Sequence, residues 1–465
     1  MELLVLGVKE LDDLIGGGFH HPSMIVIAGH PGSGKTTLAS TICASNAEKG
    51  HKCLYLTFQE DREKLLDNME KLGIKMKQLE QKGMVSFIDM PTMLDVEDAV
   101  KEISSLINKH GFKILVVDSL NSLLMNVESS RSRAILQNFF YNVSRLTSGL
   151  IILVAELPLG SDRLDLGSVE FIADIVLVLK HKIERELIAR SMEFRKVRGA
   201  SITVAETPFS IISGKGIQVW TPIVPELAEE REEFVMPCRL LRETIRFIRR
   251  GEVLFFSYPP DVRVAEQTLG IAPLLLSFAK LNNLKVVFIS YRYPGSTIKN
   301  LYTDIIASKL GVDKDTVAKL IDKHMVFRGL NPYSFSIGEL MARVSEIISE
   351  AGGADVLVLH ATELHYLVED PDRYVSFLSN HLNHLKSRGV STIILGSKVS
   401  DNYYNLNTIL ADIVASYRRN NKREPTEHYT LIWRKGGDTY HILPSENIVE
   451  CVKEAYKSIK EMIQK

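Results

Sequence analysis

The sequence predicts an α/β protein made of two tandem domains, each with a mostly parallel β-sheet flanked by helices. Continuous apolar runs alternate with helix-forming segments along the chain, which is typical of parallel strands covered by helices on both faces. A chain of 465 residues is also too long for one ordinary hydrophobic core. Finally, the pattern of apolar runs restarts past the middle of the chain, at a period of about 230 residues, which indicates an internal duplication.

In the first half, helices and strands are expected to alternate in the manner of a parallel sheet. Glycines Gly16–Gly18 end a short first helix, and Gly50 ends a longer one. The expected helices span residues 10–14, 35–49, 61–72, 96–108 and 132–146. The expected strands span residues 25–28, 52–58, 85–90, 113–118, 150–155, 175–179, 192–198 and 217–220, the last two near an edge of the sheet.

A proline- and glutamate-rich stretch between Thr221 and Pro237 is the expected connection between the halves. The predicted domains are residues 1–225 and 238–465, with residues 226–237 as the linker. In the second domain, strands are expected in the same order as in the first, at residues 253–256, 285–290, 355–360, 392–396, 413–416 and 430–434.

Composition argues against several functional classes. The net charge of −1 gives no long-range attraction to nucleic acid or to an acidic membrane. No apolar stretch approaches the roughly 20 residues of a membrane helix, and the early Glu2 argues against a signal peptide. The four cysteines are scattered without a C-x-x-C pair, which argues against zinc ribbons and disulfide scaffolds and favours a reducing compartment. The expectation is a soluble, cytoplasmic protein.

The segment Ile25–Thr37 carries the clearest chemical signal. A β-branched run stops at Gly29, a loop of small residues follows, and Lys35 opens a helix-forming stretch, as in the P-loop pattern G-x-x-x-x-G-K-[ST]. The loop amides and the helix N-terminus form an anion cradle, and Lys35 adds a charge near the β- and γ-phosphates. The predicted nucleotide-binding residues are Gly29, His30, Pro31, Gly32, Ser33, Gly34, Lys35, Thr36 and Thr37.

Two oxygen ligands for Mg²⁺ are expected beside this loop. Thr36 offers a hydroxyl to a small hard cation. Asp118 ends an apolar strand, and a carboxylate at that edge of a parallel sheet can hold the metal directly or through water. A strand-end aspartate alone is a weak signal, but a position about 80 residues after a P-loop favours a Walker B role.

A group that activates water is expected where the strand 52–58 ends. Phosphoryl transfer to water needs such a group in line with the γ-phosphate, and Glu60 is the first candidate. The alternative is that Glu60 and Asp61 only form the acidic N-terminus of the next helix. The residue types leave both interpretations open.

Lys196 and Arg198 alternate along a late strand, so a period of two places both on one face. Two cations there suit a phosphate supplied by a neighbouring subunit, in the manner of an arginine finger. A solvated basic edge that deters unwanted strand pairing is the other interpretation.

These motifs together resemble the KaiC family of RecA-like ATPases over residues 1–225. The matching segments are Leu14–Gly18, the P-loop, Tyr55–Glu60, Asp118–Ser119, Val169–Asp174 and Lys196–Gly199. The resemblance implies tandem RecA-like domains, ATP held between subunits of a ring that is usually a hexamer, and Lys196 and Arg198 acting on the neighbour's nucleotide. It also implies a general base at position 59, where the family usually carries glutamate. Gln59 can orient water but cannot accept its proton, so hydrolysis is expected to be slow unless Glu60 takes over.

The second half keeps the strand pattern and loses the phosphate chemistry. When Pro31 is aligned with Pro259, no loop glycine has a glycine counterpart, and the metal-binding threonine is lost. His360 stands where the metal-binding aspartate is expected, and Arg292-Tyr293 stands where Gln59-Glu60 is expected. This joint loss predicts a second domain that lacks a functional P-loop and serves regulation, assembly or partner binding.

Three functions stay open on the sequence. The leading one is a KaiC-like ring ATPase that binds ATP or ADP and acts as a nucleotide-dependent regulator or scaffold, with a regulatory protein partner reached through the second domain. The second is a RecA- or RadA-like DNA recombination or repair ATPase, whose DNA-binding loop would be Leu157–Glu170. The acidic residues of that loop suit phosphate poorly, so nucleic acid is not the expected partner. The third is an ATP-binding structural protein without turnover.

Overall fold

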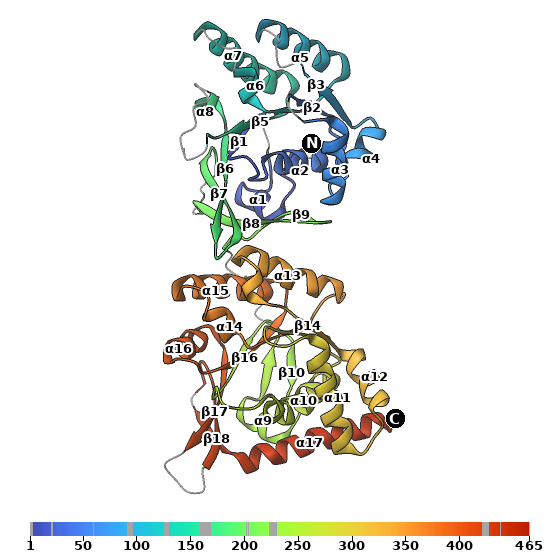
Figure 1. Ribbon diagram of the computed structural model, residues 1–465, viewed down its shortest axis with the longest axis vertical. Coiled ribbons are helices and arrows are strands. Elements are labelled where there is room, and N and C mark those ends of the chain that lie inside the picture. Colours follow the sequence, from blue (N-terminus) through green and yellow to red (C-terminus); the bar gives the residue numbers. More distant parts are fainter. Residues whose placement is uncertain are drawn as a thin grey trace. The chain divides into compact units, whose positions relative to one another are not determined.

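The computed structural model describes residues 3–19, 22–58, 60–90, 96–124, 130–158, 169–200, 202, 204–222, 230–420, 427–437 and 439–464. The chain divides into two compact units. The first comprises Met1–Pro222 with Ser336–Ala342, and the second comprises Ile223–Phe335 with Arg343–Lys465. Each unit is built around one large sheet (Figure 1). The predicted linker 226–237 lies partly outside the described residues, and the domain bounds stay a prediction.

The first unit alternates helices and strands along the chain. Its helices are α1 (Lys9–Leu14), α2 (Lys35–Glu48), α3 (Arg62–Lys71), α4 (Met76–Gln81), α5 (Val96–His110), α6 (Leu120–Leu124), α7 (Ser130–Thr147) and α8 (Val169–Ile172). Its strands are β1 (Ser23–Gly29), β2 (Cys53–Thr57), β3 (Val85–Asp89), β4 (Ile114–Asp118), β5 (Leu150–Glu156), β6 (Ile175–Glu184), β7 (Leu187–Val197), β8 (Glu206–Ile212) and β9 (Gly216–Val219).

The second unit repeats this alternation. Its strands are β10 (Glu233–Val235), β11 (Phe247–Arg249), β12 (Val253–Tyr258), β13 (Val286–Ser290), β14 (Met325–Gly329), β15 (Val356–His360), β16 (Ser391–Ser397), β17 (Ile413–Asn420), β18 (Glu427–Arg434) and β19 (Tyr440–Pro444). Its helices are α9 (Arg239–Thr244), α10 (Val264–Leu281), α11 (Gly295–Leu310), α12 (Lys314–His324), α13 (Ile337–Glu350), α14 (Glu363–Tyr366), α15 (Pro371–Ser387), α16 (Asp401–Leu410) and α17 (Ser445–Ile463), with a 3₁₀ turn at Pro332–Ser334.

The two large sheets share one strand order, except that β9 of the first has no counterpart in the second. The first runs β3-β2-β4-β5-β1-β6-β7-β8-β9 and the second β14-β13-β15-β16-β12-β17-β18-β19. In both, the strands up to β6 or β17 pair in parallel, and the later ones pair antiparallel. Position by position the sheets correspond, with β12 at the place of β1 and β15 at the place of β4. The predicted fold class, two tandem α/β domains with mostly parallel sheets, is confirmed.

The apolar runs of the sequence explain why the first sheet is covered on both faces. Every residue of the central strand β1 is buried. Ile25 and Ile27 pack into a core shared with α2, whereas Val26 and Ala28 pack into a second core shared with α5 and α7. Side chains that alternate between two cores need apolar residues at every position, which is the pattern of a strand buried on both faces. Figure 1 shows α2 and α3 on one side of this sheet and α5 to α7 on the other.

The antiparallel end of the first sheet differs from the expectation. The strand expected at 192–198, near an edge, is the longer strand β7, and β8 and β9 lie beyond it. Strand β8 was not predicted, because its burial is interrupted and Pro208 lies within it. The hairpin of β6 and β7 extends past the predicted strands and turns at Arg185 and Glu186, which both have a positive φ.

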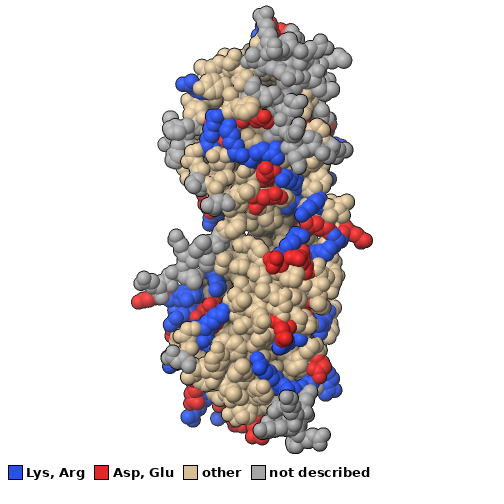
Figure 2. Space-filling model, turned by 90° about the vertical axis from the view of Figure 1, so that its left-hand side faces the viewer, with Lys and Arg blue, Asp and Glu red and all other residues tan. Residues whose placement is uncertain are grey.

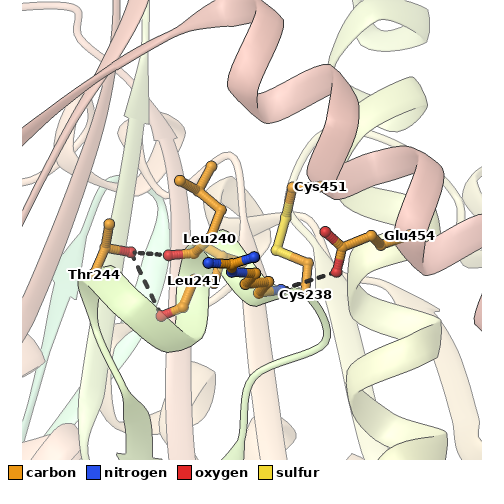
Figure 3. The surroundings of a disulfide bond; sticks show 7 residues. Cys238, Leu240, Leu241, Thr244, Cys451 and Glu454 are labelled. Carbon is orange, nitrogen blue, oxygen red and sulfur yellow. Dashed lines mark hydrogen bonds between the residues drawn. A yellow bond between two sulfur atoms is a disulfide. The ribbon is translucent and has the colours of Figure 1, made fainter.

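The four cysteines form two disulfides, so the sequence argument against a disulfide scaffold is wrong. Cys43 of α2 is bonded to Cys53 of β2, with Cα atoms 6.0 Å apart. Cys238 is bonded to Cys451 of α17, with Cα atoms 5.3 Å apart and a sequence separation of 213. Spacing in the sequence could not reveal the second pair, because only the fold brings α17 back to the start of α9 (Figure 3).

The distribution of surface charge and the hydrophobicity of the helices agree with the overall composition. Figure 2 shows Lys and Arg side chains interspersed with Asp and Glu on the visible face of each unit, as a net charge of −1 suggests. Among the described residues, no helix combines the length and the hydrophobicity that crossing a bilayer requires.

Replacing Cys451 by serine is expected to lower the free energy of unfolding of the second unit by about 2–4 kcal/mol, because the bond closes a long loop in the unfolded chain. Trp433 fluorescence during urea unfolding reports this unit once Trp220, the other tryptophan, is replaced by phenylalanine. The control is Cys43→Ser, which opens the disulfide of the first unit and should leave the Trp433 transition in place. A Trp433 transition that the Cys451→Ser change does not move would contradict the prediction.

Candidate functional site

The loop after β1 has the backbone shape that phosphate binding requires. Gly32 and Gly34 have φ angles of +76° and +101°, a region that residues with a Cβ rarely adopt. A Cβ atom at Gly29 would lie 2.4 Å from the carbonyl oxygen of Leu179. Gly34 is the N-cap of α2, and the first turn of α2 has neither a side-chain cap nor an acidic residue. The backbone N–H groups of this turn are therefore open to an anion.

Lys35 is the first residue of α2, directly after this loop. Its side chain is largely buried, and Nζ donates a hydrogen bond of 3.0 Å to the carbonyl oxygen of His30. Burial lowers the pKa of Lys35, while the negative charges of Glu156 and Asp118 act in the opposite direction. A lysine held by a single carbonyl next to two carboxylates can exchange that contact for a phosphate oxygen.

Asp118 is held by side chains from two neighbouring elements. Thr36 Oγ1 of α2 and the Tyr55 hydroxyl of β2 both donate to Asp118 Oδ2, at 2.8 and 2.9 Å. Burial raises the pKa of Asp118, and the hydrogen bonds from Thr36 and Tyr55 oppose that rise because they stabilise the ionised form. The two residues predicted to bind Mg²⁺, Thr36 and Asp118, are thus in direct contact.

The residues around this pair fit a hydrated cation and a phosphate chain. Ser33 Oγ and Ser119 Oγ are buried, and neither has a hydrogen-bond partner among the described residues. Buried hydroxyls are costly without a partner, and both belong to segments that carry the predicted ligands. The hydroxyl of Thr36 and the carboxylate of Asp118 are the hard oxygen donors that Mg²⁺ prefers.

Glu60 and Asp61 make different contacts. The Asp61 side chain is the N-cap of α3 and accepts a hydrogen bond of 2.9 Å from the backbone N–H of Lys64. The carboxyl group of Glu60 has no hydrogen bond or ion pair with a described residue. Partial burial, and then the charge of Asp118, raise the pKa of Glu60. Gln59, the other candidate for acting on water, lies outside the described residues.

Lys196 and Arg198 lie together, away from the P-loop of their own chain. Lys196 Nζ and Arg198 Nη2 both donate to the carbonyl oxygen of Phe171, at 2.8 and 2.7 Å. In the strand register, Lys196 of β7 pairs with Val176 of β6, and Val176 pairs with Val26 of β1. Val26 lies three residues before Gly29. At about 3.3 Å per residue, Lys196 is roughly 10 Å back along the sheet from the P-loop. Arg198 lies farther back, since its N–H bonds Asp174 O.

Sequence reasoning assigned no role to Tyr55, Glu156 or Asn121. Tyr55 is fully buried beside Asp118. Glu156 ends β5 level with Gly29, and its backbone N–H donates to Asn121 Oδ1 at 2.6 Å. A signal for Glu156 existed, because it ends an apolar strand as Asp118 does. Tyr55 had no such signal, since a tyrosine within an apolar strand is indistinguishable from an ordinary core residue.

In the second sheet, the carboxyl ends of the parallel strands are occupied by side chains that bond to one another. Arg292 Nη2 lies 2.7 Å from Oε1 of Glu363, which is fully buried. The other oxygen of Glu363 accepts a hydrogen bond of 3.1 Å from the backbone N–H of Ser397. His360, at the place of Asp118, lies 3.0 Å from the Ser290 hydroxyl, and burial together with Arg292 lowers its pKa to about 4. This edge presents a neutral imidazole and a closed ion pair in place of a metal-binding carboxylate.

Comparison with known proteins agrees with the geometry of the first unit. A family model described as "ATPase: KaiC" matches residues 5–223. The chain is 29% identical over 196 residues to the "Circadian clock oscillator protein KaiC" of Prochlorococcus marinus subsp. pastoris, covering 42% of this chain and 38% of that protein. It is 28% identical over 197 residues to the protein of that name from Thermostichus vulcanus, with the same coverage.

A third relative extends the match a little further. The "Circadian clock oscillator protein KaiC" of Parathermosynechococcus lividus is 26% identical over 219 residues, which cover 46% of this chain and 40% of that protein. These alignments span about two fifths of the length of each relative.

Replacing Tyr55 by phenylalanine is expected to move the loss of Mg²⁺-dependent ATP binding to higher pH. A metal ligand at Asp118 would have to be ionised, so binding is expected above the pKa of that group and is expected to be lost as the pH falls through it. Burial raises this pKa, and removing the Tyr55 hydrogen bond raises it further. Titrating a fluorescent ATP analogue between pH 8 and pH 5 measures the effect. The ratio of the variant's affinity to the wild-type affinity at each pH cancels the titration of ATP itself. Identical pH dependence of the variant and the wild type would contradict the prediction.

Proposed function

We propose, from the premise that the first domain belongs to the KaiC family of RecA-like ATPases, that this protein binds ATP with Mg²⁺ and hydrolyses it slowly at subunit interfaces of a ring. The observation that carries the proposal is the contact of Thr36 and Asp118 beside an open helix N-terminus. Residues 29–37 would hold the phosphates, with Lys35 near the β- and γ-phosphates.

Glu60 is the proposed group that acts on the attacking water. Its carboxyl group has no hydrogen bond or ion pair with a described residue, and this together with its raised pKa suits proton transfer better than an ion-paired carboxylate would. Asp61, which serves as a helix cap, is excluded from this role by its hydrogen bond to Lys64. Gln59 would orient the water, and because an amide takes no proton, we expect slow turnover.

Lys196 and Arg198 are proposed to act on the nucleotide of the next subunit. Their position roughly 10 Å or more back along the sheet keeps them from the P-loop of their own chain. In a ring with head-to-tail contacts, each subunit can present such a pair to its neighbour. The carbonyl oxygens of α8 now bind both cations, and a phosphate would be a stronger partner. We propose a hexamer as the ring.

The second domain is proposed to serve regulation or assembly through a protein partner. Its Arg292–Glu363 pair occupies the edge where the first domain would hold metal, so ATP binding in the same mode is not expected there. We further propose that the protein acts in the cytoplasm. Because the cysteines form two disulfides, they no longer argue for a reducing compartment. Intracellular disulfides do occur in proteins of hyperthermophiles.

Replacing Lys35 by alanine is expected to weaken ATP binding by about 100-fold, because a charge-assisted contact to phosphate is lost. Isothermal titration calorimetry with ATP and Mg²⁺ measures the change. The matched control is Lys49→Ala, which removes an exposed lysine at the other end of the same helix. Equal affinities of the two variants would refute the P-loop assignment.

Mixing Lys35→Ala and Arg198→Ala subunits is expected to restore ATP hydrolysis that neither variant shows alone. Random mixing at equal amounts gives an intact P-loop facing an intact Arg198 at about one quarter of the interfaces. Phosphate release measures activity, and light scattering with and without ATP measures ring size on the same samples. A mixture as inactive as its components, in rings of confirmed size, would show that Arg198 does not act across an interface.

A further inference from the structure

The second domain contains an apolar cavity of about 640 Å³ that the proposed ATPase function does not use. Its floor is one face of the sheet, formed by alternate residues such as Leu254 and Phe256 of β12 and Ile413 and Ala415 of β17. Its roof is formed by α10 and α17. The volume lies within the range of small-molecule sites, about 300–1,000 Å³.

The cavity lies between the sheet and α10, the helix that follows β12 and occupies the place of α2 in the first domain. In the first domain, α2 buries small residues such as Ala39 and Ala44 in one core with the strands, and every residue of β1 is buried. In the second domain, the equivalent strand β12 alternates buried with partly exposed residues. The partly exposed ones, Leu254 and Phe256, are those that line the cavity. Large α10 side chains, Leu275 among them, face this space.

The wall is suited to hydrocarbon. Its polar groups are few, and some are already used within the protein. The Tyr417 hydroxyl is bonded to His428 Nδ1 at 2.8 Å, and Ser445 Oγ donates to the carbonyl oxygen of His428 at 2.8 Å. A nucleotide or sugar would lose its hydrogen bonds to water here and gain few in return. An empty apolar space of this size would be costly.

The exposed part of the wall carries positive charge. Lys309 of α11 and Lys453 of α17 line the cavity and are exposed, as are the apolar Leu269 and Val449. The described residues that line the cavity include no aspartate or glutamate. Lys309 forms no ion pair with a described residue, whereas Lys453 lies 3.0 Å from Glu450. The opening therefore complements an anionic group attached to an apolar body.

The frame of the cavity is covalently fixed. Pro237 and Leu241, which lie beside Cys238, and Val452, which follows Cys451, belong to its wall. The Cys238–Cys451 bond joins these two segments, and Glu454 accepts a hydrogen bond of 2.9 Å from the backbone N–H of Arg239 next to it (Figure 3). These contacts fix α17 to the segment that starts α9.

We propose that the second domain binds a single-chain amphiphile, with its hydrocarbon tail in the cavity between the sheet, α10 and α17 and its anionic head group at Lys309 and Lys453. The ligand is recognised by chain length and by head charge. Carboxylate and phosphate heads share the required chemistry.

Displacement of anilinonaphthalene sulfonate fluorescence by dodecanoate, below its micelle concentration, tests the proposal on the full-length protein. Decanoate should bind about 16-fold more weakly, since it lacks two methylenes and each contributes about fourfold. Dodecyl phosphate should bind in the range of dodecanoate, and dodecanol more weakly than both. A dodecyl phosphate affinity well above that of dodecanoate would assign the site to phosphate heads, and the reverse to carboxylates.

Two variants separate the tail site from the head site. Ala415→Phe fills the cavity and should weaken dodecanoate and dodecanol alike, by at least tenfold. Lys309→Glu with Lys453→Glu, both on the surface, should weaken dodecanoate by about three- to tenfold and leave dodecanol unchanged. Lys460→Glu, an exposed lysine of α17 outside the wall, is the matched control.

Binding without dependence on chain length, or equal binding by the wild type and the Ala415→Phe variant in its folded form, would overturn the proposal. So would the absence of saturable binding by any of the three amphiphiles. Lys35→Ala should bind dodecanoate as the wild type does, so failure of the ATPase proposal and failure of this one are distinguishable.

Discussion

The chemistry of the first domain depends on the meeting of parallel strand ends at one edge of a sheet. There, Asp118 is partly buried and accepts hydrogen bonds from Thr36 and Tyr55. Desolvation favours the neutral acid and the two donors favour the anion. The hydrogen bond from Thr36 holds the carboxylate next to the loop that begins at Gly29. A cation bound there would add to the positive charge of Lys35 and offset the negative charge of Asp118.

The two domains keep the same strand order and differ in what fills the space around it. At the carboxyl edge, the first domain leaves the first turn of α2 uncapped, and the second closes the edge with Arg292 and Glu363. On the sheet face, the small residues of α2 allow close packing, whereas α10 stands over a cavity. Strand pairing tolerates such changes because it is made by the backbone, while loops and helix faces are made by side chains. Duplication could therefore conserve the sheet and release the second domain from phosphate chemistry.

In the proposed reaction, part of the positive charge comes from a neighbouring chain. The register of β1, β6 and β7 sets Lys196 and Arg198 back from the P-loop, and Phe171 O meanwhile satisfies both cations. A site completed only on assembly would couple turnover to ring formation, because the stabilising charge is absent from the isolated subunit. The disulfides add rigidity within each domain, at α2 in the first and at α17 in the second.

The sequence by itself determined most strands of the two large sheets, the duplication and the P-loop pattern, because buried parallel strands and a glycine-rich phosphate loop are local patterns. It also placed Thr36 and Asp118 in one site, since strand ends of a parallel sheet meet. Only the tertiary structure decided the contact of Tyr55 with Asp118, the different contacts of Glu60 and Asp61, and the pairing of Cys238 with Cys451. These depend on which side chains the fold brings together across long stretches of chain. The cavity beneath α10 is of the same kind, because a gap in packing is a property of several elements at once and leaves no trace in any one of them.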